Sequence, residues 1–150
     1  MPTNEEEYAY GLAQEHELKP FFDLFFGKNL TETEKWDPFD FVGENIKIEL
    51  KSRRNTYAKY PTTIVGMYKI NQICDLPSPI EHYFVFNFLD GVYYWKYNKD
   101  EFRNMKQITI KRRDRPGSKG SKYLSIPIGS LTKMEKDIAL DMSEEDCERD

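Results

Sequence analysis

Hydrophobic and polar positions alternate most regularly between residues 45 and 53. The apolar positions there are Ile46, Ile48 and Leu50, and the polar positions between them are Lys47, Glu49 and Lys51. A period of two predicts a β-strand with one face toward a hydrophobic core. A short apolar run at residues 39–42 comes before it, and the Gly43-Glu44 pair between the two is a turn signal. We therefore expect a hairpin of two strands.

A helical period precedes this hairpin. Thr3 followed by Glu6 is a capping box that opens a helix. One face of the helix carries four side chains at helical spacing: Tyr8, Leu12, Glu15 and Leu18. We expect Pro20 to kink or restart the helix and Gly27 to cap its end.

The rest of the chain predicts mainly strands. After residue 61 we expect a strand and a helix within residues 62–75, strands at residues 82–89 and 92–97, a helical turn at residues 99–105, and strands at residues 107–111 and 123–128. Asp90-Gly91 marks a hairpin, and Pro127 indicates an edge strand. The predicted fold class is α/β: a mixed β-sheet flanked by a few helices, in a single domain of residues 1–133 with an acidic tail at residues 134–150.

The composition is typical of one intracellular domain. The chain has 150 residues, 39% of them hydrophobic, which is enough for one core. No apolar run approaches the roughly 20 residues that cross a bilayer, and the acidic start of the chain lacks the pattern of a secretory signal. The two cysteines, Cys74 and Cys147, do not form a metal-binding pair. We expect a protein of the cytoplasm or nucleus with no membrane partner.

Charge is distributed unevenly along the chain. Residues 1–50 carry four basic and 12 acidic side chains, residues 51–122 carry 15 and six, and residues 123–150 carry three and eight. A basic middle segment suits an anionic partner better than the net charge of -4 suggests. A solvated charged surface is the alternative explanation.

Asp40 and Glu49 form the candidate site. If the turn between the strands has two or four residues, Asp40 lies opposite Lys47 and shares a face with Glu49 and Lys51. Two facing carboxylates are unfavourable unless a cation or a proton lies between them, and a hard divalent ion such as Mg²⁺ suits an all-oxygen site. The ammonium group of Lys51 beside this ion would orient water or stabilise charge on phosphate oxygens.

The same positions also fit an exposed strand face on which Lys and Glu form ordinary cross-strand pairs. The Glu-x-Lys triplet alone does not separate these alternatives, because Glu17-Leu18-Lys19 repeats it on the predicted helix. There its two ends do not share a face, and no strand acid precedes it.

The segment Asp-Pro-Phe-Asp at residues 37–40, followed by Ile-Glu-Leu-Lys at residues 48–51, resembles the PD-(D/E)xK nuclease superfamily. Residues 11–15 are similar to the first helix of that family, as in archaeal Holliday-junction resolvases. The resemblance covers residues 8–53. Asp37 competes with Asp40 for the role of the acid at the strand end, and Asp40 is favoured because the β pattern begins there.

The resemblance implies a restriction-endonuclease-like fold and hydrolysis of phosphodiester bonds with Mg²⁺ or Mn²⁺, leaving a 5′-phosphate and a 3′-hydroxyl. It implies that Asp40 and Glu49 bind the metal with help from the Leu50 carbonyl, that Glu15 is an accessory ligand, and that Lys51 is the catalytic lysine. DNA is favoured over RNA as the substrate, and the choice between endonuclease and exonuclease stays open.

Basic residues that follow the site are candidate contacts to nucleic acid: Arg53, Arg54, Lys59, Lys69, Lys111, Arg112, Arg113 and Arg115. Phosphate contacts of this kind give sequence-independent, salt-sensitive affinity. For residues 112–121 the alternative is a solvated loop.

Two further functions remain open at this point. One is a non-catalytic nucleic-acid-binding module on the same fold, and the other is an interaction protein that joins an assembly through the acidic tail. The small size leaves no room for a separate recognition domain. We therefore expect recognition by shape, by a homodimer or by a partner protein.

Overall fold

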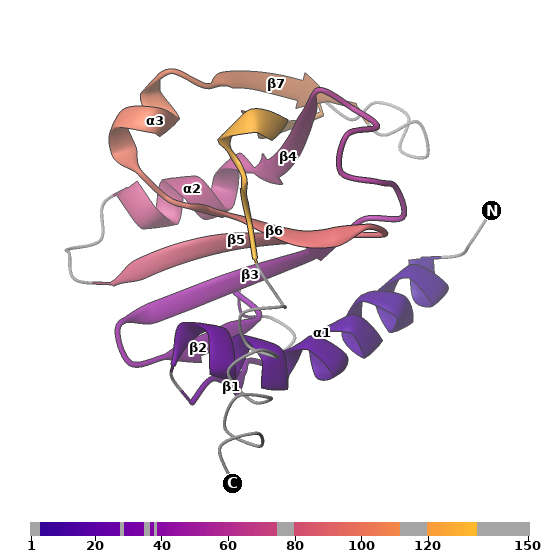
Figure 1. Cartoon of the computed structure of the whole chain (residues 1–150). Coiled ribbons are helices and arrows are strands. Elements are labelled where there is room, and N and C mark those ends of the chain that lie inside the picture. Colours follow the sequence, from indigo (N-terminus) through magenta and orange to yellow (C-terminus); the bar gives the residue numbers. More distant parts are fainter. Residues whose placement is uncertain are drawn as a thin grey trace, which may run out of the picture.

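The computed structural model describes residues 4–27, 29–34, 37, 39–74, 80–111 and 120–134. These residues form a mixed α/β domain with a six-stranded sheet, a three-stranded sheet and three helices (Figure 1). The predicted class, a mixed sheet with a few helices, is confirmed at this level. None of the described helices is long and apolar enough to cross a membrane.

The larger sheet has the order β1-β2-β3-β5-β6-β9. Its strands are β1 (Thr31–Glu32), β2 (Phe41–Gly43), β3 (Ile46–Ser52), β5 (Glu81–Phe88), β6 (Gly91–Lys96) and β9 (Thr132–Lys133). The central pair, β3 and β5, runs parallel, and all other neighbours run antiparallel. A parallel pair needs a crossover connection, which β4 (Thr62–Gly66) and helix α2 (Met67–Cys74) supply.

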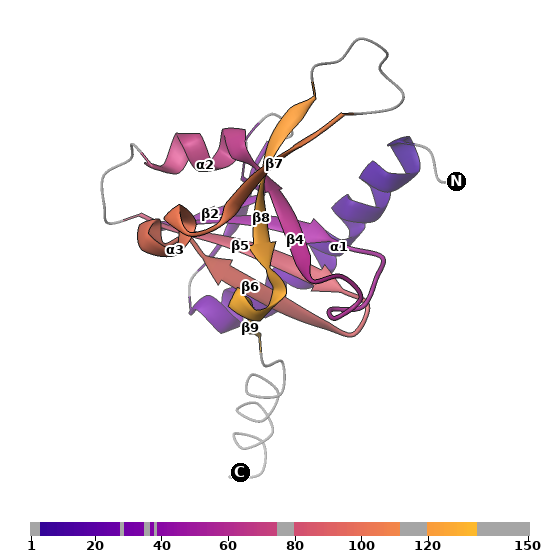
Figure 2. The same cartoon turned by 90° about the horizontal axis from the view of Figure 1, so that it is seen from above.

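The smaller sheet has the order β4-β8-β7, with β7 at Lys106–Ile110 and β8 at Ser121–Pro127. Its strands cross those of the larger sheet when the molecule is seen from above (Figure 2). The short helix α3 (Lys99–Arg103) joins β6 to β7, and a 3₁₀ turn at Ile128–Ser130 joins β8 to β9.

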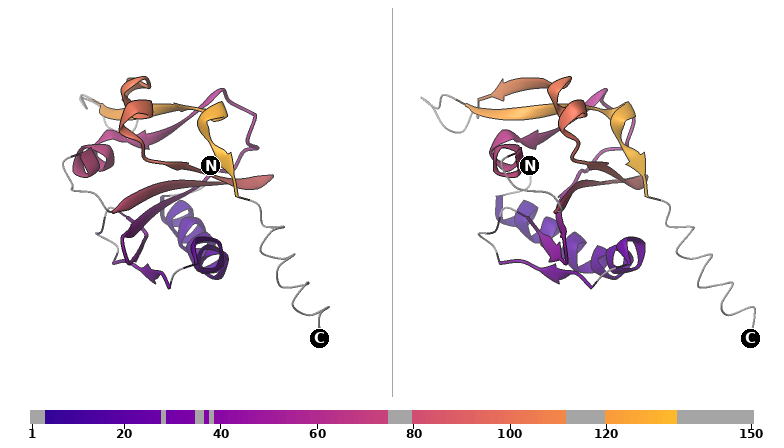
Figure 3. Two further views of the ribbon diagram at one scale, coloured as in Figure 1. Left: turned by 60° about the vertical axis from the view of Figure 1, so that its left-hand side comes forward. Right: turned by 90° about the vertical axis from the view of Figure 1, so that its left-hand side faces the viewer.

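Hydrophobic residues cover both faces of the larger sheet. Helix α1 (Asn4–Phe26) packs on one face, and α2 with the smaller sheet packs on the other (Figure 3). On the α1 side, Leu18 and Phe22 meet Ile48 and Leu50 of β3. On the opposite side, aromatic residues of β5 meet α2, β4 and β8. The apolar face of β3 is therefore buried against α1, as its alternation predicted, while on the other face Glu49 is buried and Lys47 and Lys51 are partly exposed.

Helix α1 continues through Pro20, so the predicted restart there is not found. Leu18 and Phe22, on either side of the proline, are both buried against the sheet, and this packing offsets the missing backbone hydrogen bond. The predicted cap at the helix end is confirmed: Gly27 follows the last helical residue with φ +64°, the left-handed conformation that glycine adopts without strain.

The hairpin of β2 and β3 exists, but its register differs from the prediction. The turn lies at Glu44-Asn45, so Val42, and not Asp40, pairs with Lys47. Asn45 has φ +60°, a conformation that asparagine tolerates better than most residues, and it thereby fixes the position of the turn. The shift is two residues, an even number, so the predicted faces of the strand are preserved.

Most of the later elements fall where they were predicted. The hairpin of β5 and β6 turns at Leu89-Asp90. Strand β8 is the centre of its sheet and not an edge, although Pro127 pairs only with Thr62 of β4, beyond the end of β7. Met134, assigned above to the tail, is 1% exposed and its amide bonds to the Val92 carbonyl. Residues 135–150 lie outside the described residues.

Candidate active site

Strand β3 extends beyond its neighbour β2. The ladder between the two strands ends at the pair Phe41–Ile48, so Glu49 to Ser52 pair only with β5. The exposed edge of a strand leaves backbone groups that need other partners. Asp40 provides one: its carboxylate accepts a hydrogen bond from the Leu50 amide at 2.7 Å, and its own amide donates to the Ile48 carbonyl at 2.9 Å.

This free edge opens into a cleft of about 320 Å³ between α1 and α2. The cleft is lined by all four residues predicted as catalytic: Glu15, Asp40, Glu49 and Lys51. Leu50 lines it too, although the contact seen at Leu50 is made by its amide, and the predicted role of its carbonyl stays a prediction. The cleft therefore unites residues from the first helix and from the hairpin.

Glu15 and Asp40 approach each other closely enough for their carboxyl groups to form a hydrogen bond. Burial, together with the nearby charge of Glu15, raises the pKa of Asp40 to about 6, whereas the hydrogen bond from the Leu50 amide opposes the shift. Burial also raises the pKa of Glu15, and the neighbouring acids Glu32 and Glu49 add to this effect. Both acids therefore hold a proton more tightly than isolated carboxylates do, mainly because they are buried, although Lys51 and Lys69 partly offset the shifts.

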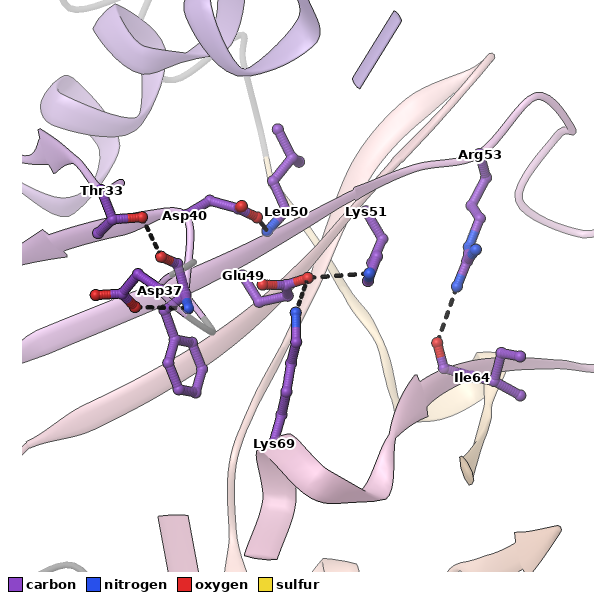
Figure 4. A network of polar contacts seen from close by, with 10 residues as sticks. Thr33, Asp37, Asp40, Glu49, Leu50, Lys51, Arg53, Ile64 and Lys69 are labelled. Atoms are coloured by element: carbon purple, nitrogen blue, oxygen red, sulfur yellow. Dashed lines mark hydrogen bonds and ion pairs between the residues drawn. The ribbon is translucent and has the colours of Figure 1, made fainter. Parts of the chain in front are cut away.

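Glu49 is 3% exposed and lies between two lysines (Figure 4). Its Oε1 atom pairs with the Lys51 ammonium at 3.1 Å and, more closely, with the Lys69 ammonium. Burial raises the pKa of Glu49, and Asp40 adds to this, while the two lysines oppose it. The other oxygen, Oε2, is buried without a hydrogen-bond partner among the described residues.

Lys69 is the main residue that the sequence did not assign to the site. It was expected among the phosphate contacts, but it is 6% exposed and bound to Glu49. Helix α2 places it there because Met67, Ile70 and Ile73 turn toward the core. Lys69 lies next to this apolar stripe, four residues before Ile73. That spacing indicates that its side chain points inward.

The donor set fits a divalent cation held partly by water. Among the described residues, no three Asp, Glu, His or Cys side chains are placed so that together they could hold a metal ion, so the carboxylates of the cleft would supply at most two of the ligands. Mg²⁺ commonly takes one or two carboxylates and keeps several waters. The buried and unpartnered Oε2 of Glu49, next to the carboxyl of Asp40, is the kind of acceptor that such an ion would satisfy.

Asp37 has a different task from Asp40. Its carboxylate accepts the Phe39 amide at 2.9 Å, and the Thr33 hydroxyl donates to the Phe39 carbonyl (Figure 4). These bonds close the turn that leads into β2. Asp37 lines the cleft as well, but Asp40, just before β2, is the acid whose carboxylate is hydrogen-bonded to β3 at Leu50.

The other predicted nucleic-acid contacts are spread over several surfaces. Arg53 is partly buried, and its guanidinium donates to the Ile64 carbonyl at 2.9 Å. Arg54 is exposed and lies over the Tyr10 ring, while Lys59 and Lys111 are exposed. Arg112, Arg113 and Arg115 lie outside the described residues. The structure thus brings Arg53 and Lys69 toward β3, and the remaining described residues stay at the surface.

No model of a known protein family and no curated protein matches this sequence.

Proposed function

We propose that this protein is a metal-dependent nuclease that hydrolyses phosphodiester bonds, with DNA favoured over RNA. The observation that carries the proposal is the cleft at the free edge of β3. It gathers Glu15, Asp40, Glu49 and Lys51, and one buried oxygen of Glu49 has no partner there. The mixed sheet with the acidic hairpin at its centre is consistent with the restriction-endonuclease-like fold that the resemblance implies.

Asp40 and Glu49 would hold Mg²⁺ or Mn²⁺, with Glu15 as an accessory group. Such an ion supplies Lewis acidity and lowers the pKa of bound water. The raised pKa values of Glu15 and Asp40 mean that protons compete with a cation for these carboxylates, so cation binding would favour their ionised forms.

Lys51 is suited to act on the phosphate. Its side chain is 38% exposed, whereas that of Lys69 is 8% exposed. Lys51 can therefore reach a substrate in the cleft while staying within 3.1 Å of Glu49. Its ammonium group would orient the attacking water or stabilise charge on the phosphate oxygens. Lys69 holds Glu49 from the buried side.

A purely structural ion pair is the competing explanation of this cluster. It accounts for Glu49 and Lys69, but it does not explain why Asp40 and Glu15 are held next to them with raised pKa values. Like charges gathered in a cleft oppose folding. Such an arrangement is typical of functional sites, where binding a ligand relieves the repulsion.

The test is cleavage of a panel of single- and double-stranded DNA and RNA in Mg²⁺, in Mn²⁺ and in chelator. Lys51→Ala should abolish cleavage, and Lys96→Ala should not, because Lys96 is an exposed lysine of β6 that pairs with Glu81 outside the cleft. A Lys51→Ala variant that cleaves at the wild-type rate would refute the assignment of the active site to this cleft. Salt-sensitive binding of nucleic acid without any cleavage would favour the non-catalytic module.

A further inference from the structure

A second hollow, of about 270 Å³, lies at the end of β3. Its walls come from the loop after β3, from β4 and from the ends of β5 and β8. The residues that line it include Arg53, Asn55, Tyr57, Tyr60, Thr62 and Phe88. We call this hollow the Arg53 pocket.

The Arg53 pocket continues the catalytic face of β3. Side chains two residues apart on a strand point to the same side, and Figure 4 shows Glu49, Lys51 and Arg53 in a row on one side of β3. Two residues of a strand span roughly 7 Å. The pocket therefore begins two residues beyond Lys51, and one substrate strand can contact both Lys51 and the pocket.

Arg53 is a partly buried cation whose charge is favoured by the charge of Glu49, although the two residues form no ion pair. Among the described residues it forms no ion pair, and its contacts are the Ile64 carbonyl at 2.9 Å and the Phe86 ring. Burial lowers the pKa of the guanidinium, which reflects the lost hydration. A desolvated charge is costly unless an opposite charge pairs with it. The planar fork of an arginine is well suited to a phosphate.

The rest of the pocket suits a flat aromatic group. Tyr57 is stacked on Tyr93 with ring centroids 3.9 Å apart, and its hydroxyl donates to the Ile128 carbonyl, so its ring is held in place. Tyr60 at the rim is 54% exposed, with the Lys59 ammonium 5.5 Å from its ring centre. The pocket thus combines one aromatic ring that is held in place with an exposed ring beside a cation, and proteins use aromatic rings near cations to stack unpaired bases.

We propose that the Arg53 pocket binds one nucleotide of the substrate strand, with a phosphate on the Arg53 guanidinium and the base against Tyr60. This inference rests on the proposed nuclease function, because it takes the bound nucleotide to be part of the substrate strand. It adds to that function where one nucleotide of the strand binds. A base that enters the pocket must be unpaired, so the preferred substrate is single-stranded, frayed or flipped next to the cleavage point.

The experiment is an NMR titration of the full chain in chelator, where no metal-dependent cleavage can occur. The probes are thymidine 5′-monophosphate, thymidine and inorganic phosphate. We expect the nucleotide to shift amide resonances of residues 53–64 and to bind more tightly than either of the other probes. Tyr60→Ala should weaken its binding roughly 5- to 100-fold, the range seen for loss of one stacked base.

Tyr68→Ala is the matched control, because Tyr68 is 59% exposed and has the Lys69 ammonium 5.6 Å from its ring, yet it lines the catalytic cleft. It should leave the affinity unchanged. Weakening by Tyr68→Ala in place of Tyr60→Ala would put the nucleotide in the catalytic cleft and overturn the inference. If inorganic phosphate binds as tightly as the nucleotide, the pocket recognises only an anion, and this result would also overturn the inference.

This titration and the cleavage assay fail independently. A protein that binds the nucleotide at the Arg53 pocket but cuts no substrate keeps the binding site and loses the nuclease. A protein that cuts nucleic acid but shows no shifts at residues 53–64 keeps the nuclease and loses the pocket. Arg53→Met adds a second probe of the phosphate contact, with its fold checked because Arg53 also bonds to Ile64.

Discussion

Replacing Asp40 with asparagine should stabilise the metal-free protein at neutral pH while abolishing cleavage. The pKa of Asp40 is raised from 3.8 to about 6, mainly by burial and then by Glu15. Asparagine keeps the geometry, because its carbonyl oxygen can accept the Leu50 amide and its amide group can donate to Glu15. It removes only the charge that the cleft opposes.

The magnitude follows from proton linkage. A shift of about 2 units, at 1.36 kcal/mol per unit, corresponds to about 3 kcal/mol at most. Because the native pKa is the higher one, the folded state binds more protons between pH 3.8 and about 6, and wild-type stability falls as pH rises through this window. The advantage of Asp40→Asn should be about 3 kcal/mol at pH 8 and about 1 kcal/mol at pH 4.5.

Urea unfolding in chelator at these two pH values measures this difference. Glu17→Gln is the control, since Glu17 is an exposed acid on the same helix as Glu15, and it should change the stability by less than about 0.5 kcal/mol. Mg²⁺ should stabilise the wild type and not Asp40→Asn. An Asp40→Asn variant that is less stable than the wild type at pH 8, or whose advantage is equal at both pH values, would refute the reasoning.

Three further outcomes are expected. Lys69→Met should destabilise the protein by about 3–5 kcal/mol in urea, because it leaves Glu49 as a buried unpaired charge, and adding Glu49→Gln should recover much of the loss; no recovery would show that the two residues are not coupled. Glu15→Gln should slow cleavage about 10- to 100-fold while Glu17→Gln leaves it unchanged, and equal rates for both would remove Glu15 from the site. His82 has a buried Nε2 without a partner among the described residues, and its pKa is lowered by burial and then by Lys47. Stability measured by urea unfolding should therefore fall as pH drops below about 6.5, and His82→Phe should lose this part of the pH dependence; an unchanged slope would exclude His82 as the cause.

The candidate acids could be predicted from the sequence because they depend on local patterns. The alternation around Glu49 fixes which side chains share a face, and this result survives an error of two residues in the hairpin register. The register itself could not be derived from the turn signal alone. Asn45, which adopts a left-handed conformation, moved the turn one residue beyond Gly43-Glu44.

The partners of these acids come from distant parts of the chain, and local patterns do not predict them. Lys69 reaches Glu49 only because the crossover between β3 and β5 lays α2 over that face of the sheet. Arg53 continues the polar row of β3, but the loop after it folds back and partly buries it. Both were expected as phosphate contacts. The apolar stripe of α2 indicates that Lys69 points inward, but only the tertiary fold determines that it meets Glu49.

The most direct test of a metal-dependent nuclease site is the rate at which the wild type and Glu49→Gln cleave single-stranded DNA, first in chelator and then at increasing Mg²⁺ concentrations. A metal site at the edge of β3 predicts wild-type cleavage that is absent in chelator and saturates with Mg²⁺, and no saturable cleavage by a folded Glu49→Gln variant. Cleavage that persists in chelator, or a Glu49→Gln variant with the wild-type dependence on Mg²⁺, would contradict a metal site at the edge of β3.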